Sequence, residues 1–245
     1  MINQLRYLIF ILLCTPLVCS GQGNADGTAA LKRVMNTIKN TQNISYKYDL
    51  SVLYPNGQSD RMKGDLFIDN IGMIMYNSSN YSTILYTGKW TYKADHSTKE
   101  ITLVDNEKHL SKENKMQTEK EIFQNVTASI FIDSVILRKA IVKKYLNSND
   151  TTFIEVGFPD EMFIKSIILK FNDREGKLIS YNMITFRPWE DNTFGKNKGT
   201  RNTINCSNFI KGIEKNAYKT DKFFLIENGK VILKKYANYK VIAKI

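Results

Sequence analysis

The sequence predicts a mainly β (α+β) fold in which one antiparallel sheet is accompanied by a small amount of helix. Apolar and polar side chains alternate over residues 44–54, which is typical of a strand with one dry and one wet face. Further alternating runs follow with only short turn-forming segments between them. Helical spacing of apolar residues occurs in the segment 31–42 and again after Thr118.

The first 21 residues have the order of a signal peptide. Arg6 precedes an apolar run over 7–13, and the small residues Ser20 and Gly21 follow. The apolar run is shorter than the roughly 20 residues that a membrane-spanning helix needs. We therefore expect cleavage near Gly21 and an exported, unlipidated, soluble periplasmic protein.

Cys19 leaves a second outcome open for the leader. Leu17-Val18-Cys19 is similar to a bacterial lipoprotein processing site, in which the cysteine carries the lipid. Val18 stands where such sites usually have a small residue. The alternative location is thus the cell envelope, with a lipid anchor at Cys19.

The composition is basic and poor in cysteine. The net charge of +11 becomes +10 when Arg6 leaves with the leader. A lysine-rich solvent face explains this charge, and so does attraction to anionic membranes or acidic partners. No nucleic-acid-binding motif accompanies the charge, so we expect no nucleic-acid partner. Cys206 is then the single cysteine of the mature chain, and we expect it to be a buried thiol.

The first half of the mature chain predicts one helix and a meander of strands. Leu31, Val34, Met35 and Ile38 form one apolar stripe on a helix within residues 28–42. The period then changes to two. We expect strands at 44–54, 59–69, 72–77, 81–87, 90–95 and 100–105.

The second half predicts more strands after a charged break. A second helix is expected from Thr118 to about Ile136. Residues 188–205 are polar and predict a long loop, and 207–216 predict a short helix. We expect strands at 140–146, 152–158, 163–172, 177–187, 223–228, 230–236 and 239–243. No linker-like segment divides residues 22–245, which predicts a single domain with about ten or eleven strands in its sheet.

The sequence carries little sign of catalytic machinery. His96 and His109 lack the spacing of a zinc site, and no phosphate-binding loop or nucleophile elbow is present. We therefore expect no enzymatic activity, no cofactor and no metal. A hydrolase that uses His96, His109 or Cys206 remains a third hypothesis, which loss of turnover in variants of these residues would identify.

The dry face of the predicted sheet is rich in aromatic side chains and methionine. Flexible methionines and amphipathic rings suit a surface that accepts varied apolar shapes. The same residues also suit a closed core. The pattern alone leaves open whether this face is a cavity or a filled interior.

The order of the first elements resembles a known family. A helix over 31–42 leads to the long strand 44–54, then to Lys63-Gly64-Asp65-Leu66-Phe67-Ile68 and to the segment 84–95. This order resembles the LolA/LolB-like periplasmic lipoprotein carriers, well over residues 28–105 and less closely to Arg187. The resemblance implies a strongly bent antiparallel sheet that forms an incomplete β-barrel, with helices packed on its concave face. It also implies an apolar face that holds acyl chains, without catalytic residues.

Two departures accompany this resemblance. The family's gating arginine has no clear counterpart, and the corresponding strand offers Lys47. The chain beyond about residue 188 looks like a C-terminal extension. The function expected is a periplasmic carrier of lipoprotein or lipid acyl chains with membrane-bound delivery partners. The alternative is a non-enzymatic envelope sensor or protein-interaction module. The expected lipid-binding residues are Tyr46, Tyr48, Leu50, Val52, Leu66, Ile68, Met73, Trp90 and Tyr92.

Overall fold

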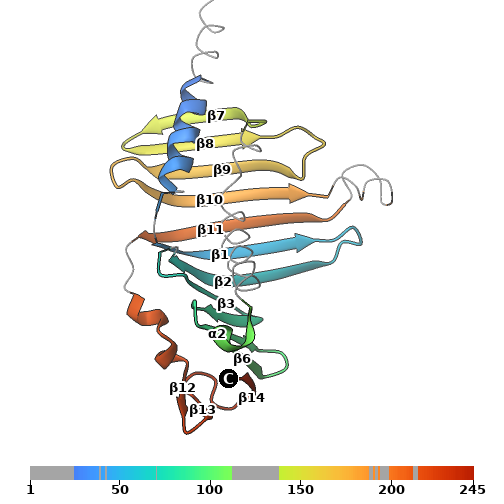
Figure 1. Ribbon diagram of the computed structural model, residues 1–245. Coiled ribbons are helices and arrows are strands. Elements are labelled where there is room, and N and C mark those ends of the chain that lie inside the picture. The colour runs from blue at the N-terminus through green and yellow to red at the C-terminus, as the bar shows by residue number, and fades with distance from the viewer. Residues whose placement is uncertain are drawn as a thin grey trace, which may run out of the picture.

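The structure is a computed structural model of the chain (Figure 1). It describes residues 25–38, 40–41, 43–69, 71–111, 138–187, 190, 193, 199–211 and 215–245. The expected signal peptide, lipid anchor at Cys19 and helix from Thr118 to Ile136 lie outside these residues.

A twelve-stranded sheet organises the described part of the chain (Figure 1). Its strand order is β14-β6-β5-β4-β3-β2-β1-β11-β10-β9-β8-β7. The bounds are β1 Asn43–Leu53, β2 Ser59–Asp69, β3 Ile74–Ser79, β4 Ser82–Tyr86, β5 Trp90–Asp95, β6 Glu100–Asp105, β7 Ile141–Ser148, β8 Thr151–Gly157, β9 Ile164–Asn172, β10 Lys177–Phe186, β11 Arg201–Lys211 and β14 Lys240–Lys244. The four-residue helix α2 (Asn106–His109) follows β6, capped by the Asp105 carboxylate.

The architecture corrects two expectations. The sheet is open, and it is neither closed nor strongly curled, so the expected incomplete barrel is replaced by an extended layer. The sheet is also mixed, because β14 runs parallel to its neighbour β6, whereas the remaining strand pairs are antiparallel. A final strand that reaches the sheet edge after a long excursion can join in either direction, and the local sequence of β14 does not specify which.

The strand predictions are confirmed for β1 to β10 and for β14, with β2 occupying the expected residues 59–69. The expected hairpin turn after β9 contains Gly176 at φ 56°, a backbone region that glycine enters without steric cost. Alternation and turn chemistry are therefore sufficient to locate these strands along the chain.

Strand β11 overturns the prediction for residues 188–216. The sequence predicts a loop up to Asn205 and a helix from Ser207, whereas Arg201–Lys211 form a strand. This strand pairs with β1 on one side and β10 on the other, so it joins the two halves of the sheet. Asn208 has φ 54° beside a register shift, and this irregularity interrupts the alternation that would reveal the strand.

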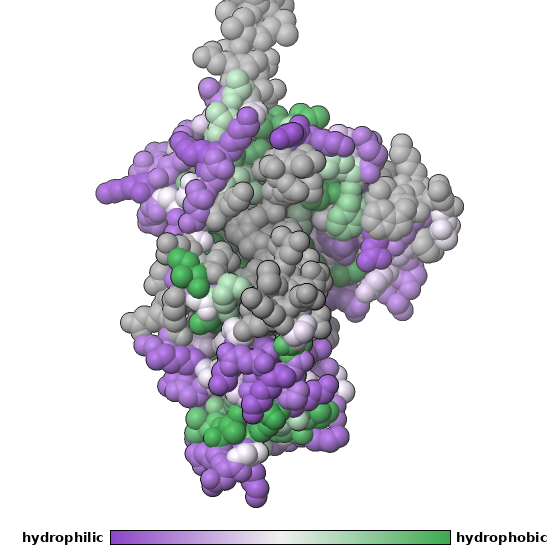
Figure 2. All heavy atoms as spheres, in the orientation of Figure 1, coloured by the Kyte–Doolittle hydropathy of each residue, from purple (hydrophilic) through white to green (hydrophobic). Residues whose placement is uncertain are grey.

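The C-terminal segment covers one face of the sheet at its β3–β6 end. It comprises two 3₁₀ turns, η2 (Lys215–Tyr218) and η3 (Thr220–Lys222), and a separate hairpin of β12 (Phe224–Glu227) and β13 (Lys230–Leu233). Phe223 and Phe224 pack in a cluster with Tyr92 and Leu103 of the sheet. Apolar side chains also reach the surface over this part of the molecule, at the lower end of the view in Figure 2.

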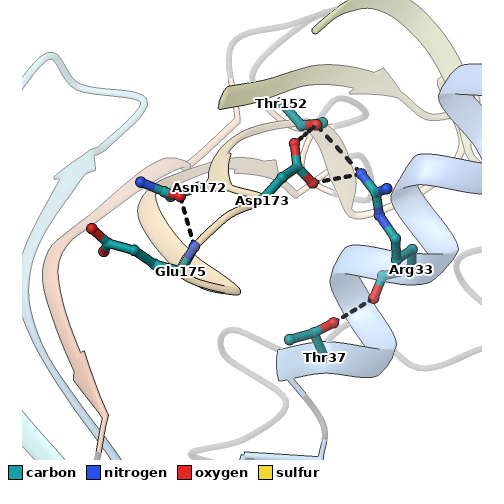
Figure 3. Close-up of polar contacts among 6 residues, drawn as sticks. All are labelled: Arg33, Thr37, Thr152, Asn172, Asp173 and Glu175. Atoms are coloured by element: carbon teal, nitrogen blue, oxygen red, sulfur yellow. Dashed lines mark hydrogen bonds and ion pairs between the residues drawn. The ribbon is translucent and has the colours of Figure 1, made fainter. Parts of the chain in front are cut away.

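The opposite face of the sheet carries the larger core. A helix over residues 25–38 lies across β7–β10 (Figure 1) and buries the apolar stripe that the sequence predicts. Its Arg33 Nη2 donates to Asp173 Oδ1 at 2.6 Å, and Asp173 Oδ2 accepts from Thr152 Oγ1 at 2.5 Å (Figure 3). This contact fixes the helix against the turn after β9 and the start of β8. The sheet thus has one core on each face.

Candidate ligand-binding face

Six of the nine expected lipid-binding residues lie on the face that the N-terminal helix partly covers. Tyr46, Tyr48, Leu50 and Val52 alternate along β1 and therefore point to one side. Leu66 and Ile68 of β2 stand opposite Tyr46 and Ile44, so they point the same way. The register confirms that these two strands share an apolar face.

The beginning of β1 belongs to a closed core. Tyr46, Leu66 and Ile68 are buried, and the ring of Tyr46 stacks on that of Phe209 at 5.2 Å between centroids. All three side chains belong to the larger core cluster. Their primary role is to stabilise the fold.

Towards the end of β1 the same face is only half-buried. Leu50 pairs with Met62 of β2 on one side and with Ile204 of β11 on the other, and Ile204 pairs with Met183 of β10. We call Met62, Leu50, Ile204 and Met183 the apolar row. Its first three members are half-buried and Met183 is buried, so the row runs from a partly open surface into the core.

Polar pairs border the apolar row. On one side, Asn202 Nδ2 donates to Thr185 Oγ1 at 3.1 Å. On the other side, the Tyr48 hydroxyl donates to Asn77 Oδ1 at 2.8 Å. The Tyr48 ring lies over Gly64, where a Cβ atom would come within 2.5 Å of Tyr48 Cζ. Four neighbouring strands about 4.8 Å apart give the row a length of about 14 Å.

Uncharged side chains lie beside Leu50, Ile204 and Met183, whereas the carboxylate of Asp60 lies beside Met62 at the other end of the apolar row. Burial raises the pKa of the Cys206 thiol to about 12, and burial also raises the pKa of Tyr181, its cross-strand neighbour. Desolvation raises the pKa of Tyr48 despite its hydrogen bonds to Ser79 and Asn77. The side chains of Tyr48, Tyr181 and Cys206 are therefore neutral at physiological pH, which suits an apolar ligand beside Leu50, Ile204 and Met183 rather than a charged one.

Three expected site residues lie elsewhere. Trp90 and Tyr92 of β5 point to the opposite face, where Tyr92 stacks parallel to Phe224 at 6.1 Å. Met73 is in the turn before β3 with φ 49° and is not a strand residue. The expectation that Trp90, Tyr92 and Met73 join the β1 face is therefore wrong. Alternation shows which residues of one strand share a side, but it does not say which side of the sheet that is.

Three members of the apolar row are not among the nine expected lipid-binding residues, although the sequence places one of them, Met62, on the same side of its strand as Leu66 and Ile68. Ile204 lies within the segment that the sequence predicts as a loop. Met62 and Met183 stand in correctly predicted strands, and their parity within those strands was the available signal. Their position beside Leu50 depends on the order β2-β1-β11-β10, in which β1 and β11 are far apart in sequence.

A mixed cavity of about 740 Å³ lies between the C-terminal segment and the sheet. Tyr76, Tyr218 and Phe223 form apolar parts of its wall, while Lys47 and Asp65 are directly opposed on its sheet side. Lys235 Nζ sits 5.3 Å from the centre of the Phe223 ring and donates to the Tyr76 hydroxyl at 3.2 Å. Charges of both signs line this cavity, so its chemistry differs from that of the apolar row.

The described ranges lack two further features. These ranges contain no group of three or more His, Cys, Asp or Glu side chains placed to hold a metal ion. They also contain no helix with the length and apolarity that crossing a membrane requires.

The comparisons with known proteins find distant structural similarity only. No family model and no curated protein matches the sequence. An uncharacterised conserved protein from Thermus thermophilus is 5% identical with a TM-score of 0.41, over 87% of this chain and 96% of that one. The lipoprotein LppX of Mycobacterium tuberculosis is 6% identical with a TM-score of 0.41, over 78% and 98%. A LolA superfamily protein from Nitrosomonas europaea is 8% identical with a TM-score of 0.32, over 80% and 98%.

Proposed function

We propose that this protein is a non-catalytic carrier that binds the acyl chain of a lipid or lipoprotein along the apolar row, in the periplasm of a bacterium. The observation that supports the proposal is the half-buried continuation of the core face over Met62, Leu50 and Ile204. In a closed core, the apolar side chains at the edge of the core are followed by polar ones. Here three neighbouring strands place apolar side chains beyond it, with polar pairs at the borders.

The energetics of such a site favour an acyl chain. Each methylene group that leaves water gains about 0.8 kcal/mol, so several groups lying along the row would bind without a strong polar contact. Met62 and Met183 can adjust their side chains to chains of different shape. The neutral side chains beside Leu50, Ile204 and Met183 impose no charge requirement on the part of the ligand that contacts these three residues.

A titration with a fluorescent fatty acid tests the proposal with two variants of one strand. Leu50→Asp places a charge on the apolar row and should weaken binding of the probe at least tenfold, since an ionised carboxylate beside an acyl chain is costly to desolvate. Lys47→Asp is the matched control, because Lys47 is exposed and points to the opposite face of β1. It should bind the probe as the wild type does.

Melting curves on the same samples separate binding from folding. Leu50 is half-buried, so Leu50→Asp should fold, whereas a charge at the buried Leu66 would test core stability instead. The proposal would be refuted if the wild-type protein did not bind the probe. It would also be refuted if the wild type and a folded Leu50→Asp variant bound the probe equally.

The alternative function is a non-enzymatic envelope sensor or protein-interaction module. Exposed apolar side chains on the C-terminal hairpin and the adjacent edge strand favour it, namely Ile226, Ile232 and Ile242. A stable protein complex that purifies without lipid would support this alternative over the carrier.

A further inference from the structure

A second cavity, of about 600 Å³, lies at the end of the sheet where β1 finishes. Its floor includes the cross-strand row of Leu53, Arg201 and Phe186. Leu53 is an odd-numbered residue of β1, so this row is on the face opposite Leu50 and Val52. The cavity is therefore separate from the apolar row, although the last residues of β1 contribute to both.

Positive charge gathers at this cavity without compensation. Lys143, Lys165 and Arg201 line it, and no aspartate or glutamate occurs among the lining residues that the structure describes. Within the described ranges, no carboxylate forms an ion pair with any of the three. Lys165 Nζ donates to the Asp160 backbone carbonyl, a neutral partner that leaves its charge uncompensated. These three side chains, which we call the basic end, have charge available for a partner.

Two carboxylates in the vicinity are already engaged. Glu190 accepts from the Thr200 backbone N–H at 2.6 Å and pairs with Arg187 at 3.3 Å, and these contacts lower the pKa of Glu190. Asp60 accepts from the Tyr54 hydroxyl at 2.9 Å. Glu190 and Asp60 are therefore not available to pair with the basic end, and its three cations are complementary to an anionic partner.

Apolar side chains are exposed beside these cations. Leu53 is 48% exposed and lines the cavity together with Tyr54. Phe163 is 40% exposed, and its backbone carbonyl accepts a hydrogen bond from the N–H of Phe186, another lining residue. Lys165 Nζ lies 5.5 Å from the centre of the Phe186 ring. The methylene groups of a lysine can lie along apolar surface in this way while its ammonium group stays accessible. Cations mixed with exposed aliphatic and aromatic side chains are typical of surfaces that meet the headgroup region of a bilayer.

We propose that the basic end and the exposed Leu53, Tyr54 and Phe163 dock this protein on the surface of an anionic lipid bilayer. The cations attract lipid phosphates, and the apolar side chains enter the boundary between headgroups and chains. The role of this docking rests on the proposed carrier function. Strand β1 runs from the apolar row to the docked end, so an acyl chain released from the row would be close to the membrane. The docking itself is measured separately from acyl-chain binding.

Co-sedimentation with vesicles tests the proposal. The protein should bind vesicles of phosphatidylcholine with added phosphatidylglycerol and leave pure phosphatidylcholine vesicles largely unbound. Each cation near an anionic surface contributes about fivefold in affinity, so K143E/K165E/R201E should lower vesicle binding about a hundredfold or more. The charge-matched control K93E/K219E/K244E changes exposed lysines elsewhere and should bind more tightly than that variant.

Two further measurements do not depend on charge-reversal variants. Leu53→Ser should weaken vesicle binding several-fold with little change in melting temperature, since Leu53 is exposed. Added salt should weaken wild-type binding steadily.

The outcomes distinguish this proposal from the carrier. Docking by the basic end would be overturned if both triple variants lost vesicle binding equally. It would also be overturned if vesicle binding did not change with salt concentration. Binding of soluble glycerol phosphate without binding of vesicles would overturn it as well. Fatty-acid binding by K143E/K165E/R201E should equal that of the wild type, and a wild type that binds vesicles but no fatty acid would refute the carrier alone.

Discussion

At the scale of single residues, the contact between Tyr48 and Gly64 fixes the border of the apolar row. The two residues are cross-strand partners, and the ring occupies the space that a side chain at position 64 would need. A Cβ atom there would also meet the Ser78 carbonyl oxygen. Glycine therefore lets Tyr48 lie flat on β2 and reach Asn77.

Gly64→Ala should destabilise the protein by about 1–3 kcal/mol, because the added methyl group forces the ring or the strand to shift. Gly88→Ala is the matched control, since nothing lies within 4 Å of the Cβ position there. Its effect should stay within about 0.5 kcal/mol. Urea unfolding of both variants measures the difference, and equal stabilities would show that the contact at Gly64 is not tight.

Cys206 predicts a dependence of stability on alkaline pH. Burial raises its folded pKa to about 12 from 9.0, so the folded protein keeps the thiol proton after the unfolded chain loses it. The stability is therefore fully present below pH 9 and is lost as the pH rises towards 12. The slope is about 1.4 kcal/mol per pH unit for one proton.

Cys206→Ala should lower stability near neutral pH, because it removes a buried side chain, but it should flatten this alkaline slope by about one proton. Urea unfolding at several alkaline pH values checks both effects. Burial is the main cause of the raised pKa of Tyr181 and is present in both proteins, so Tyr181 contributes nearly equally to both slopes. Identical slopes for the two proteins would contradict the buried, protonated thiol.

At the scale of elements, strand β11 decides the architecture. Phe209 is 1% exposed and stacks on Tyr46, whereas its neighbour Ile210 is 52% exposed. Phe209→Ala should therefore cost about 3–5 kcal/mol through the cavity it leaves. Ile210→Ala should change stability by no more than about 0.5 kcal/mol. Thermal unfolding of both variants measures the contrast, and a larger loss for Ile210→Ala would place the strand in the wrong register.

The sequence predicts every strand of the large sheet except β11 from alternation and turns, because these signals are local. It also predicts the apolar stripe of the N-terminal helix and the shared face of Tyr46, Tyr48, Leu50 and Val52. It fails for β11, whose asparagine-rich sequence has low strand propensity and whose irregularity at Asn208 breaks the alternation. This strand owes its conformation to two neighbours, β1 and β10, and β1 is distant in sequence.

The same limit applies to the candidate site. Leu50 and Val52 could be predicted, since one strand places them on one side. Trp90 and Tyr92 could not be assigned to the correct side, because the C-terminal segment gives the sheet a second core on its other face. The assembled sheet decides on which of its two apolar faces a given side chain lies, and the sequence of one strand does not.

At the scale of the whole molecule, the sheet separates three surfaces with different chemistry. One face carries the helix-covered core and continues into the apolar row. The other face carries the C-terminal cluster at one end and the basic end near the finish of β1. A carrier needs an apolar site for its cargo and a separate surface for delivery, and this arrangement provides candidates for both.

Mass spectrometry of lipid extracted from the protein tests the carrier most directly. The protein is purified without detergent, beside a Leu50→Asp variant treated identically. The account predicts that the wild type retains acyl-chain lipid and that the folded variant retains at least about tenfold less. A wild type free of lipid, which also fails to take up added fatty acid, would show that the apolar row is filled core and would contradict the carrier function.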